Sequence, residues 1–456
     1  MSRLIIVSNR LGNPTKPASG GLAVALNGAL NSRGGIWMGW SGNITDTAPG
    51  RGDIHVQELG HITTAGVDLT QEEYDGYYLG FSNSVLWPAF HHRQDLIDSK
   101  AEYIDAYRAV NRTFARHLRE MLQPDDLIWV HDYHLIPLAS ELRAMGVENK
   151  IGFFLHIPLP PSQVMSAVPE HEWLMRSFFS YDLIGFQTEA DTENFNLYAE
   201  RRLDQPQIEG DRVKAFGSSV IAKAFPIGID VEQFRDLVAS EEAQELSDRL
   251  QTKSQGRKWI TGVERLDYSK GLPDRLKIFR RLLEKYPENR GRSTLVQIAP
   301  PTREDVEAYS DIREELERLS GAVNGEFATI DWTPVRYIHR NVPRAQLSGL
   351  FSISKVGLVT PLRDGMNLVA KEYVAVQPDD DPGVLVLSEF AGAAEQMTDA
   401  VIVNPYDIET TADALQQALN MPLDERRDRH AKLKDIVEKT DVVIWCDGFL
   451  DRLRNV

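Results

Sequence analysis

The chain has 456 residues, 42% of them hydrophobic and 26% charged, and this length favours two domains, or three. Fifty Lys and Arg against 67 Asp and Glu give a formal charge of −17, which argues against nucleic acid or an anionic membrane as the main partner. The single cysteine, Cys446, excludes an intramolecular disulfide, and no apolar run approaches a membrane span, so a cytoplasmic protein is expected.

Short β-branched or apolar segments alternate with helical patterns along the chain, which predicts parallel α/β sheets. The clearest strands of the first half are residues 4–7, 127–130, 151–156 and 183–186. Those of the second half are residues 259–263, 293–298, 356–359, 383–387 and 400–403, with helices at 273–285 and 303–320. Two doubly wound domains are therefore expected, with a boundary near residue 226. An acidic helix is predicted over 231–251, and residues 42–70 are interpreted as a surface excursion.

The first predicted strand is followed by polar and glycine-rich segments. Ser8, Asn9 and Arg10 come directly after it, and Gly20 and Gly21 open the next helix. Glycines allow the backbone to approach a ligand closely, although a plain turn has the same signature. The chain has no Walker A motif and no G-x-G-x-x-G motif, so neither ATP hydrolysis nor nicotinamide binding has support.

Aromatic residues cluster in two early segments whose neighbours are Gly, Ser and Asn. These are Trp37, Trp40 and Trp87, with Tyr77 and Tyr78. Flat aromatic faces suit sugar rings, and packing in the core is the alternative for each of them.

Polar side chains also follow the strand 127–130. His131, Asp132 and His134 lie where α/β sheets present functional groups, and His156 ends a second strand at the same edge. A metal site would need further ligands, so Asp132 is better interpreted as a ligand-binding carboxylate. For His156 a buried structural histidine is the alternative.

Two segments in the second half predict a site for a sugar nucleotide. Residues 262–272 carry Arg265 and Lys270 into a loop after a strand, where two cations can clamp a diphosphate. In residues 361–372 a strand is followed by a helix starting near Met366, whose free backbone N–H groups suit phosphate oxygens. Glu372 in that helix can accept hydrogen bonds from ribose hydroxyls. Surface cations beside ordinary loops are the alternative interpretation.

These segments carry a family resemblance. Residues 8–10, 20–21, 87–90, 131–134, 264–271 and 363–372 resemble the corresponding segments of trehalose-6-phosphate synthases, and the resemblance covers essentially the whole chain. It implies the GT-B architecture, with two Rossmann-like domains facing a cleft. Residues 1–226 would form the acceptor-binding domain, 227–440 the nucleotide-sugar domain, and 441–456 a C-terminal helix returning to the first domain.

The resemblance also implies the site residues. The donor-binding set is Gly20, Gly21, Arg265, Lys270, Val342, Asp364, Gly365, Met366, Asn367, Leu368, Val369, Ala370, Lys371 and Glu372. The acceptor-binding set is Arg10, Trp40, Tyr78, Trp87, Asp132 and Arg303. The catalytic set is Asp132, His156, Arg265 and Lys270.

The implied reaction is the transfer of glucose, with retention, from UDP-glucose or a related nucleotide to glucose 6-phosphate, giving α,α-trehalose 6-phosphate. No metal or other cofactor is expected. Two alternatives remain at this stage: a glucosylglycerol-phosphate synthase and a catalytically silent sugar-phosphate sensor. The donor nucleobase and the formation of a homo-oligomer are left open by the sequence.

Overall fold

The computed structural model describes residues 3–12, 26–30, 33–48, 53–254, 256–302 and 307–456. The chain divides into two compact units, Met1–Ile227 with Val442–Val456 and Gly228–Asp441. The predicted boundary near residue 226 lies beside this division, and the predicted C-terminal segment belongs to the first unit. In the described part of the chain, no helix is long and apolar enough to cross a membrane.

Unit 1 is built on a ten-stranded sheet in the order β3-β4-β2-β1-β5-β6-β7-β10-β9-β8. Its strands are β1 Leu4–Arg10, β2 Gly35–Ile44, β3 Ile54–Leu59, β4 Ile62–Leu69, β5 Leu127–His131, β6 Ile151–Phe154, β7 Leu183–Phe186, β8 Gln207–Glu209, β9 Arg212–Ala215 and β10 Ser218–Ala224. In this spatial order, neighbouring strands from β4 through β2, β1, β5, β6 and β7 to β10 are parallel. The outer strands β3, β9 and β8 pair antiparallel with their neighbours. The strand order reverses at β1, which lies between β2 and β5.

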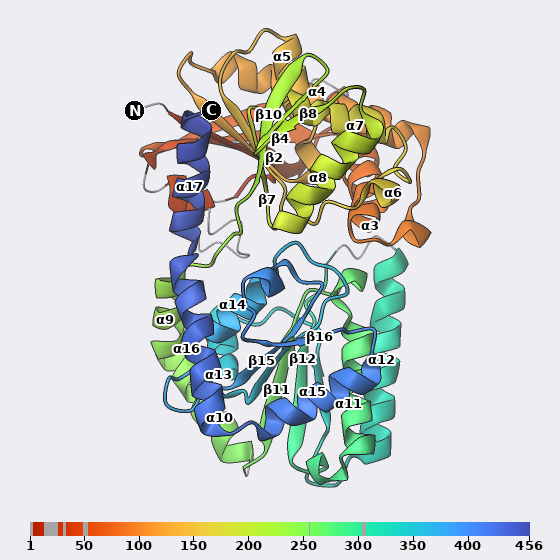
Figure 1. Cartoon of the computed structure of the whole chain (residues 1–456), viewed down its shortest axis with the longest axis vertical. Coiled ribbons are helices and arrows are strands. Elements are labelled where there is room, and N and C mark those ends of the chain that lie inside the picture. Colours follow the sequence, from red (N-terminus) through yellow and green to blue (C-terminus); the bar gives the residue numbers. More distant parts are fainter. Residues whose placement is uncertain (1–2, 13–25, 31–32, 49–52, 255, 303–306) are drawn as a thin grey trace. The chain divides into compact units, whose positions relative to one another are not determined.

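The segments that connect these strands are mostly helical. They are α2 Gln71–Glu73, the π-helical η1 Tyr74–Leu86, α3 Trp87–Phe90, η2 Gln94–Leu96, α4 Ala101–Met121, η3 Tyr133–Leu135, α5 Leu138–Ala144, α6 Ser162–Met165, α7 His171–Ser177, η4 Phe178–Ser180 and α8 Glu189–Arg202. The C-terminal helix α17, Val442–Arg454, lies beside the strands of this unit (Figure 1).

Helix α17 is seated on the sheet through its aromatic side chains. Phe449 stacks on Trp129 of β5 with ring centroids 4.7 Å apart, and both residues have no exposed surface. A Cβ atom built at Gly152 of β6 would lie 2.7 Å from the Phe449 ring. The glycine therefore leaves the space that the ring fills, and close packing of this kind stabilises the attachment of the helix.

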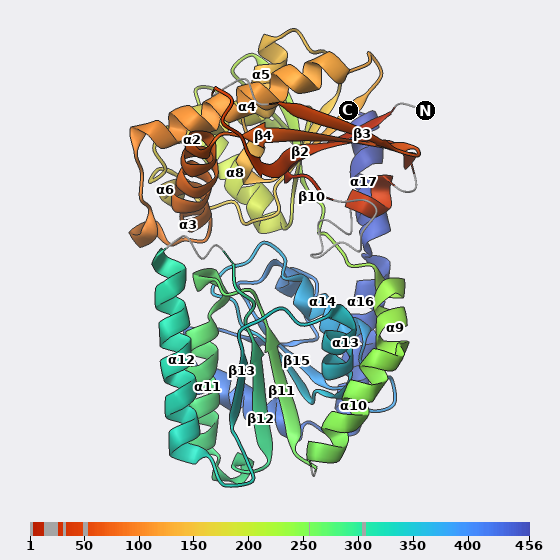
Figure 2. The same ribbon diagram turned by 180° about the vertical axis from the view of Figure 1, so that it is seen from behind.

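Unit 2 contains a six-stranded sheet in the order β13-β12-β11-β14-β15-β16, with every pair parallel (Figure 2). Its strands are β11 Lys258–Val263, β12 Ser293–Ile298, β13 Val335–Ile338, β14 Val356–Val359, β15 Val384–Ser388 and β16 Val401–Val403. Because the chain order is 3-2-1-4-5-6, this is the doubly wound nucleotide-binding topology, and its strand order reverses between β11 and β14.

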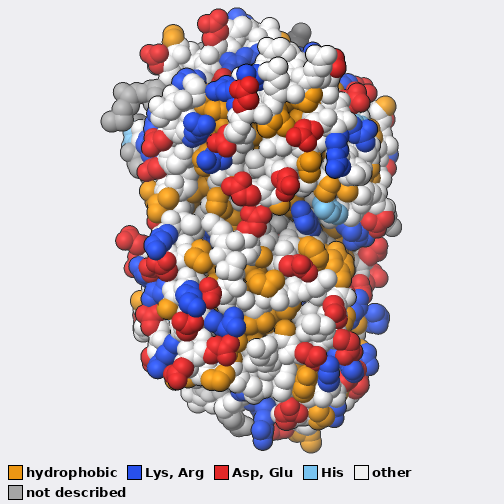
Figure 3. Space-filling view, in the orientation of Figure 1, with side chains coloured by type: hydrophobic (Ala, Val, Ile, Leu, Met, Phe, Trp, Pro, Cys, Tyr) orange, Lys and Arg blue, Asp and Glu red, His pale blue; other side chains and the backbone are white. Residues whose placement is uncertain are grey.

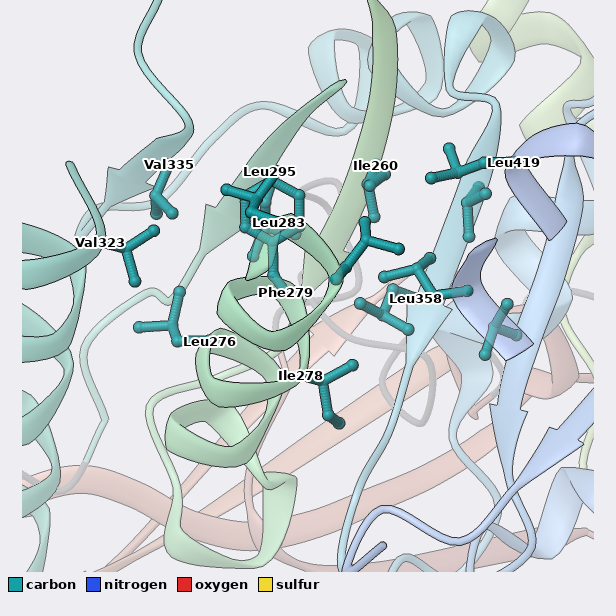
Figure 4. Close-up of a cluster of buried hydrophobic side chains, with 14 of the residues drawn as sticks. Ile260, Leu276, Ile278, Phe279, Leu283, Leu295, Val323, Val335, Leu358 and Leu419 are labelled. Carbon is teal, nitrogen blue, oxygen red and sulfur yellow. The ribbon is translucent and has the colours of Figure 1, made fainter. Parts of the chain in front are cut away.

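The helical segments of unit 2 are α9 Val231–Ala239, α10 Glu241–Ser254, η5 Tyr268–Lys270, α11 Leu272–Lys285, η6 Pro287–Asn289, α12 Glu307–Phe327, α13 Arg344–Ile353, α14 Leu368–Ala375, η7 Gly392–Glu395, α15 Ile408–Asn420 and α16 Leu423–Lys439. The core lies between the sheet and α11, α12 and α15, where side chains such as Ile260, Phe279, Leu295 and Leu358 have no exposed surface (Figure 4). This core fixes β11 and β14 side by side.

The face shown in Figure 3 carries basic and acidic side chains interspersed over both units. Residues 42–70, predicted to be a surface excursion, instead contain β3 and β4. Nearly all of β4 is buried, because it lies inside the sheet between β3 and β2, and it therefore lacks the alternation of a half-exposed strand.

Several predicted element boundaries were wrong. The acidic helix over 231–251 is two helices, because Ser240 is extended and its hydroxyl caps α10 by accepting from the Ala243 N–H at 3.4 Å. The strand predicted over 151–156 ends at Phe154, the helix predicted near Met366 begins at Leu368, and the helix predicted over 303–320 continues to Phe327.

Candidate active site

The two charged segments of unit 2 lie at its switch point. One follows β11 and the other follows β14, and these two strands are paired in the sheet. The Leu362 N–H donates to the Ser269 carbonyl at 2.8 Å, which joins the two loops directly. Open α/β sheets bind ligands outside the carboxyl ends of the strands at this place, so the topology makes it the candidate nucleotide site.

Lys270 and Asp364 connect these loops through an ion pair. Lys270 Nζ donates to Asp364 Oδ2 at 2.6 Å, and their side chains are 8% and 15% exposed. Asn367 Nδ2 donates to the same carboxylate oxygen at 3.0 Å. The Lys270 ammonium is therefore held in place by the second loop.

A second, deeper layer supports this pair. Asn367 Nδ2 also donates to Glu264 Oε1 at 2.7 Å, and the buried Arg275 places its guanidinium 3.8 Å from the same oxygen. Arg275 further donates to Thr360 Oγ1 and to Gln297 Oε1, each at 3.1 Å. Burial lowers the pKa of Arg275 to about 10, so its guanidinium stays charged at neutral pH beside the Glu264 carboxyl.

Helix α14 begins directly after the second loop. Its N-cap, Asn367, has a φ of +72°, in the left-handed region that few residues other than glycine and asparagine adopt. The first N–H groups of any helix have no acceptor within the helix, so Leu368, Val369 and Ala370 carry donors suited to an anion.

Two ionisable side chains lie within α14. Glu372 is half-buried, and burial raises its pKa to about 7. Lys371 has no exposed surface, donates to Gln396 Oε1 at 2.9 Å, and has its pKa lowered by burial to about 7. Ala370 and Lys371 have no exposed surface, backbone included, so in this structure the accessible start of α14 is formed by the half-buried Leu368 and Val369.

The other predicted donor residues differ in exposure. Arg265 is exposed, Gly365 and Met366 are buried, and Val342 is half-buried in the loop between β13 and α13. The predictions for Gly20, Gly21 and Arg303 lie outside the described residues.

The predicted acceptor residues of unit 1 gather around its own switch point. Arg10 ends β1, and Asp132 follows the neighbouring strand β5. Asp132 has a φ of +75°, a conformation that is costly for a residue with a side chain and that is found mainly at functional sites. Its Oδ1 accepts the backbone N–H of His156 at 3.2 Å, which ties the ends of β5 and β6 together.

An aromatic wall continues from Arg10. The Arg10 guanidinium lies 5.3 Å from the centre of the Trp40 ring, a cation–π contact. Tyr74 lies 5.3 Å from both Trp40 and Tyr78, and Tyr78 stacks on His134 at 5.9 Å with an interplanar angle of 11°. Trp40 and His134 are 6% and 7% exposed, so the half-buried Tyr74 and Tyr78 offer most of the accessible ring surface of this wall. Flat apolar faces beside a cation suit a phosphorylated sugar.

Trp87 and Tyr77 contribute differently. Trp87 is 4% exposed and packs on His91 and Tyr133, with ring centroids 4.1 and 5.7 Å away. Tyr77 is completely buried and donates to Asn9 Oδ1 at 2.9 Å. In this structure both rings act mainly as packing, the alternative that the sequence had left open for each.

His156 is half-buried near the start of the loop after β6, and it contacts a second histidine. Its Nε2 lies 3.1 Å from Nδ1 of His131, the completely buried last residue of β5. Burial lowers the pKa of His156 to about 3 and that of His131 well below its usual value, so both rings are neutral at physiological pH. Among the described residues, no group of three or more His, Cys, Asp or Glu side chains is arranged to hold a metal.

Three participants were missed by the sequence analysis: Tyr74, Glu264 and Arg275. His131 was named among the polar side chains after the strand 127–130, but its contact with His156 was not predicted. The spacing of Tyr74 and Tyr78 on a helical segment was the available signal for Tyr74. Arg275 lies inside an amphipathic helix, where an arginine normally points to solvent, so its burial beneath the loop could not be read from the pattern.

The topology of the two sheets and the chemistry at their switch points define a glycosyltransferase of the GT-B architecture. The sequence profile of glycosyltransferase family 20 matches residues 6–455. The chain therefore belongs to glycosyltransferase family 20.

Individual relatives resemble the chain over its full length. The trehalose-6-phosphate synthase of Sodalis glossinidius is 46% identical over 460 residues, which span 100% of this chain and 97% of that protein. An α,α-trehalose-phosphate synthase (UDP-forming) from Burkholderia xenovorans in complex with glucose-6-phosphate is 48% identical, with a TM-score of 0.94 over 99% of this chain and 100% of that chain. A protein from E. coli bound with UDP-2-fluoro glucose is 45% identical, with a TM-score of 0.95 over 100% and 99% of the two chains.

Proposed function

We propose that the protein is an α,α-trehalose-phosphate synthase, transferring glucose from UDP-glucose to the anomeric hydroxyl of glucose 6-phosphate with release of UDP. The observation that carries the proposal is the pair of switch-point sites. One is built of a lysine held by an ion pair, an arginine and a helix N-terminus, and the other of a cation, a carboxylate and aromatic rings. The full-length relatives support it, since one is named UDP-forming and in complex with glucose-6-phosphate and another is bound with a fluorinated UDP-glucose.

Unit 2 binds the donor in this proposal. Arg265 and Lys270 neutralise the diphosphate, and the first N–H groups of α14 bind its oxygens. Glu372 accepts from ribose hydroxyls, and Asp364 is placed by Lys270 and Asn367 to accept from hydroxyls of the glucose. Glucose transfer develops negative charge on the departing diphosphate, and preorganised cations stabilise such charge better than mobile water does.

Unit 1 binds the acceptor. Arg10 contacts the phosphate, while Asp132 accepts hydrogen bonds from ring hydroxyls and Tyr78 and Trp40 line the sugar face. Trp87 packs on Tyr133, whose ring in turn contacts His134 of this wall. Arg303 is proposed, from the family resemblance, as a second cation for the phosphate.

The chemistry balances without an enzymic nucleophile. The bond from the glucosyl anomeric carbon to the diphosphate oxygen breaks, and a bond from that carbon to the acceptor oxygen forms on the same face. The acceptor proton passes to the departing phosphate oxygen. A related trehalose-6-phosphate synthase, 44% identical, is described in terms of glycosyl transfer with retention, which supports this stereochemistry. We propose that no metal is required, because the two cations and α14 carry the diphosphate charge.

A nucleotide-release assay tests the proposal. Purified protein is given UDP-, ADP- or GDP-glucose with either glucose 6-phosphate or glycerol 3-phosphate. We expect nucleotide release with glucose 6-phosphate, at a kcat/KM at least about a hundredfold above that with glycerol 3-phosphate, because the smaller acceptor leaves Asp132 and the aromatic wall without partners. Preference for glycerol 3-phosphate would establish the related synthase instead, and no release with any pair would indicate a sensor.

A further inference from the structure

In unit 1 the rings of His131 and His156 stack on each other, and the position of the proton on each ring depends on the other. His131 Nδ1 and His156 Nε2 are 3.1 Å apart, within hydrogen-bonding distance, and the ring centroids are 5.3 Å apart. We propose that His131 is a positioning residue that fixes the tautomer of His156, so that His156 Nδ1 presents an N–H to an oxygen of the bound substrates. The substrate contact rests on the proposed function, whereas the effect on the tautomer does not.

A hydrogen bond between two neutral imidazoles needs one donor and one acceptor, so only two arrangements exist. In the first, His156 donates from Nε2, and the proton of His131 must then lie on its Nε2. In the second, His131 donates from Nδ1, its Nε2 is a bare acceptor, and the proton of His156 lies on Nδ1. The surroundings of His131 Nε2 therefore decide which arrangement is present.

His131 Nε2 is buried and has no hydrogen-bond partner among the described residues. Its ring lies 4.5 Å from the Trp129 ring and 6.5 Å from the Trp445 ring, measured between centroids. The indole N–H groups of both tryptophans are also buried, and no acceptor for them lies in the part of the chain that the structure describes. A proton on His131 Nε2 would add a third orphaned donor to this cluster, whereas a bare nitrogen adds an acceptor among donors.

The second arrangement is therefore favoured, since an orphaned buried N–H is the rarer and costlier defect. The complete burial of His131 and the partial burial of His156 lower the pKa of both rings and disfavour a charged histidine, so a single proton is shared between the two facing nitrogens. In this arrangement Nε2 of His156 accepts the hydrogen bond from His131. The other ring nitrogen of His156, Nδ1, therefore carries the proton and can donate it to a ligand.

The donor character of Nδ1 has a chemical consequence. An N–H can donate to a sugar hydroxyl or to a phosphate oxygen, whereas a bare nitrogen can only accept from a hydroxyl. His156 is also fixed through its backbone, because its N–H donates to Asp132 at 3.2 Å. The tautomer thus adds a directed hydrogen-bond donor beside the carboxylate of the proposed acceptor site.

Nuclear magnetic resonance of protein labelled in histidine with carbon-13 and nitrogen-15 tests the proposal directly, because ring shifts distinguish the two tautomers. His156→Gln identifies the resonances. We expect the Nδ1–H form of His156 in the wild type and in His131→Asn, whose side-chain amide can donate from the position of Nδ1. We expect a shift toward the Nε2–H form in His131→Leu, which removes the donor.

Turnover provides the second readout. In folded protein, kcat should fall by on the order of tenfold or more in His131→Leu, as when a group that orients an active-site histidine is lost, and His131→Asn should recover most of it. An Nε2–H tautomer in the wild type, an unchanged tautomer in His131→Leu, or equal losses in the two variants would overturn the proposal. If the wild type transfers no glucose, the proposed function fails while the tautomer measurement still decides the role of His131.

Discussion

Replacing each of the two donor-site cations by alanine should separate catalysis from stability. Arg265 is exposed, whereas the Lys270 side chain is 8% exposed and pairs with Asp364 at 2.6 Å. Both should stabilise charge on the departing diphosphate, so each loss should lower kcat/KM by about 10²–10³-fold, or about 2.7–4 kcal/mol of transition-state stabilisation. The two variants should differ in the free energy of unfolding.

The expected difference follows from burial. Removing one partner of a fully buried ion pair costs about 3–5 kcal/mol, because the remaining charge is left uncompensated. Asp364 keeps its hydrogen bond from Asn367, and its side chain is 15% exposed, so we expect about 2 kcal/mol for Lys270→Ala. A substitution at an exposed position such as Arg265 should change stability by less than about 0.5 kcal/mol.

The assay combines UDP release with urea unfolding followed by tryptophan fluorescence. Arg249→Ala, at an exposed arginine of α10, serves as the matched control and should change neither quantity. Normal turnover in Arg265→Ala would remove the proposed diphosphate clamp. An unchanged urea midpoint in Lys270→Ala would refute the argument that its ion pair stabilises the loops.

Three further outcomes are expected. Glu372→Gln should weaken donor binding, measured by calorimetry with UDP, yet gain stability over the wild type as pH rises from 5 to 8. In the folded wild type the pKa of Glu372 is raised to about 7, so its carboxyl keeps a proton that the unfolded chain releases near the ordinary pKa of glutamate. The free energy of unfolding of the wild type should therefore fall as pH rises through this window, and that of Glu372→Gln should not. Equal pH slopes in the two proteins would contradict this argument. Gly152→Ala should lower the free energy of unfolding by about 1–3 kcal/mol in urea titrations, because the new methyl meets the Phe449 ring at 2.7 Å, and an unchanged midpoint would show that α17 can shift. Activity should survive incubation with EDTA, and strict dependence on added Mg²⁺ would contradict the proposal that Arg265 and Lys270 carry the diphosphate.

The strands could be predicted where a short stretch of sequence is enough to mark them. Apolar runs such as 293–298 and 356–359 have the length and composition of parallel strands, and the structure has strands over the same residues. The strand β4 was missed because Ile62–Leu69 is buried on both faces and contains Thr, Gly and Asp, so neither alternation nor an apolar run marks it.

The position of a candidate-site residue was predictable where that residue lies at the carboxyl end of a strand. Arg10, Asp132 and Lys270 could be placed because parallel strands bring their carboxyl ends to one edge of a sheet. The supporting residues could not, since the burial of Arg275 against Glu264, and of His131 against His156, depends on which elements pack together. Such contacts are set by tertiary structure and leave no periodic signal in the sequence.

The most direct test of the proposed function is to identify the product. Purified protein is incubated with glucose 6-phosphate and UDP-glucose labelled with carbon-13 at its anomeric carbon, and the reaction is followed by nuclear magnetic resonance. The account predicts one new labelled anomeric signal with α configuration, coupled across an α,α-1,1 linkage to glucose 6-phosphate and formed in step with UDP. A β-configured product, a linkage to another hydroxyl, or UDP formation with release of free glucose alone would contradict it.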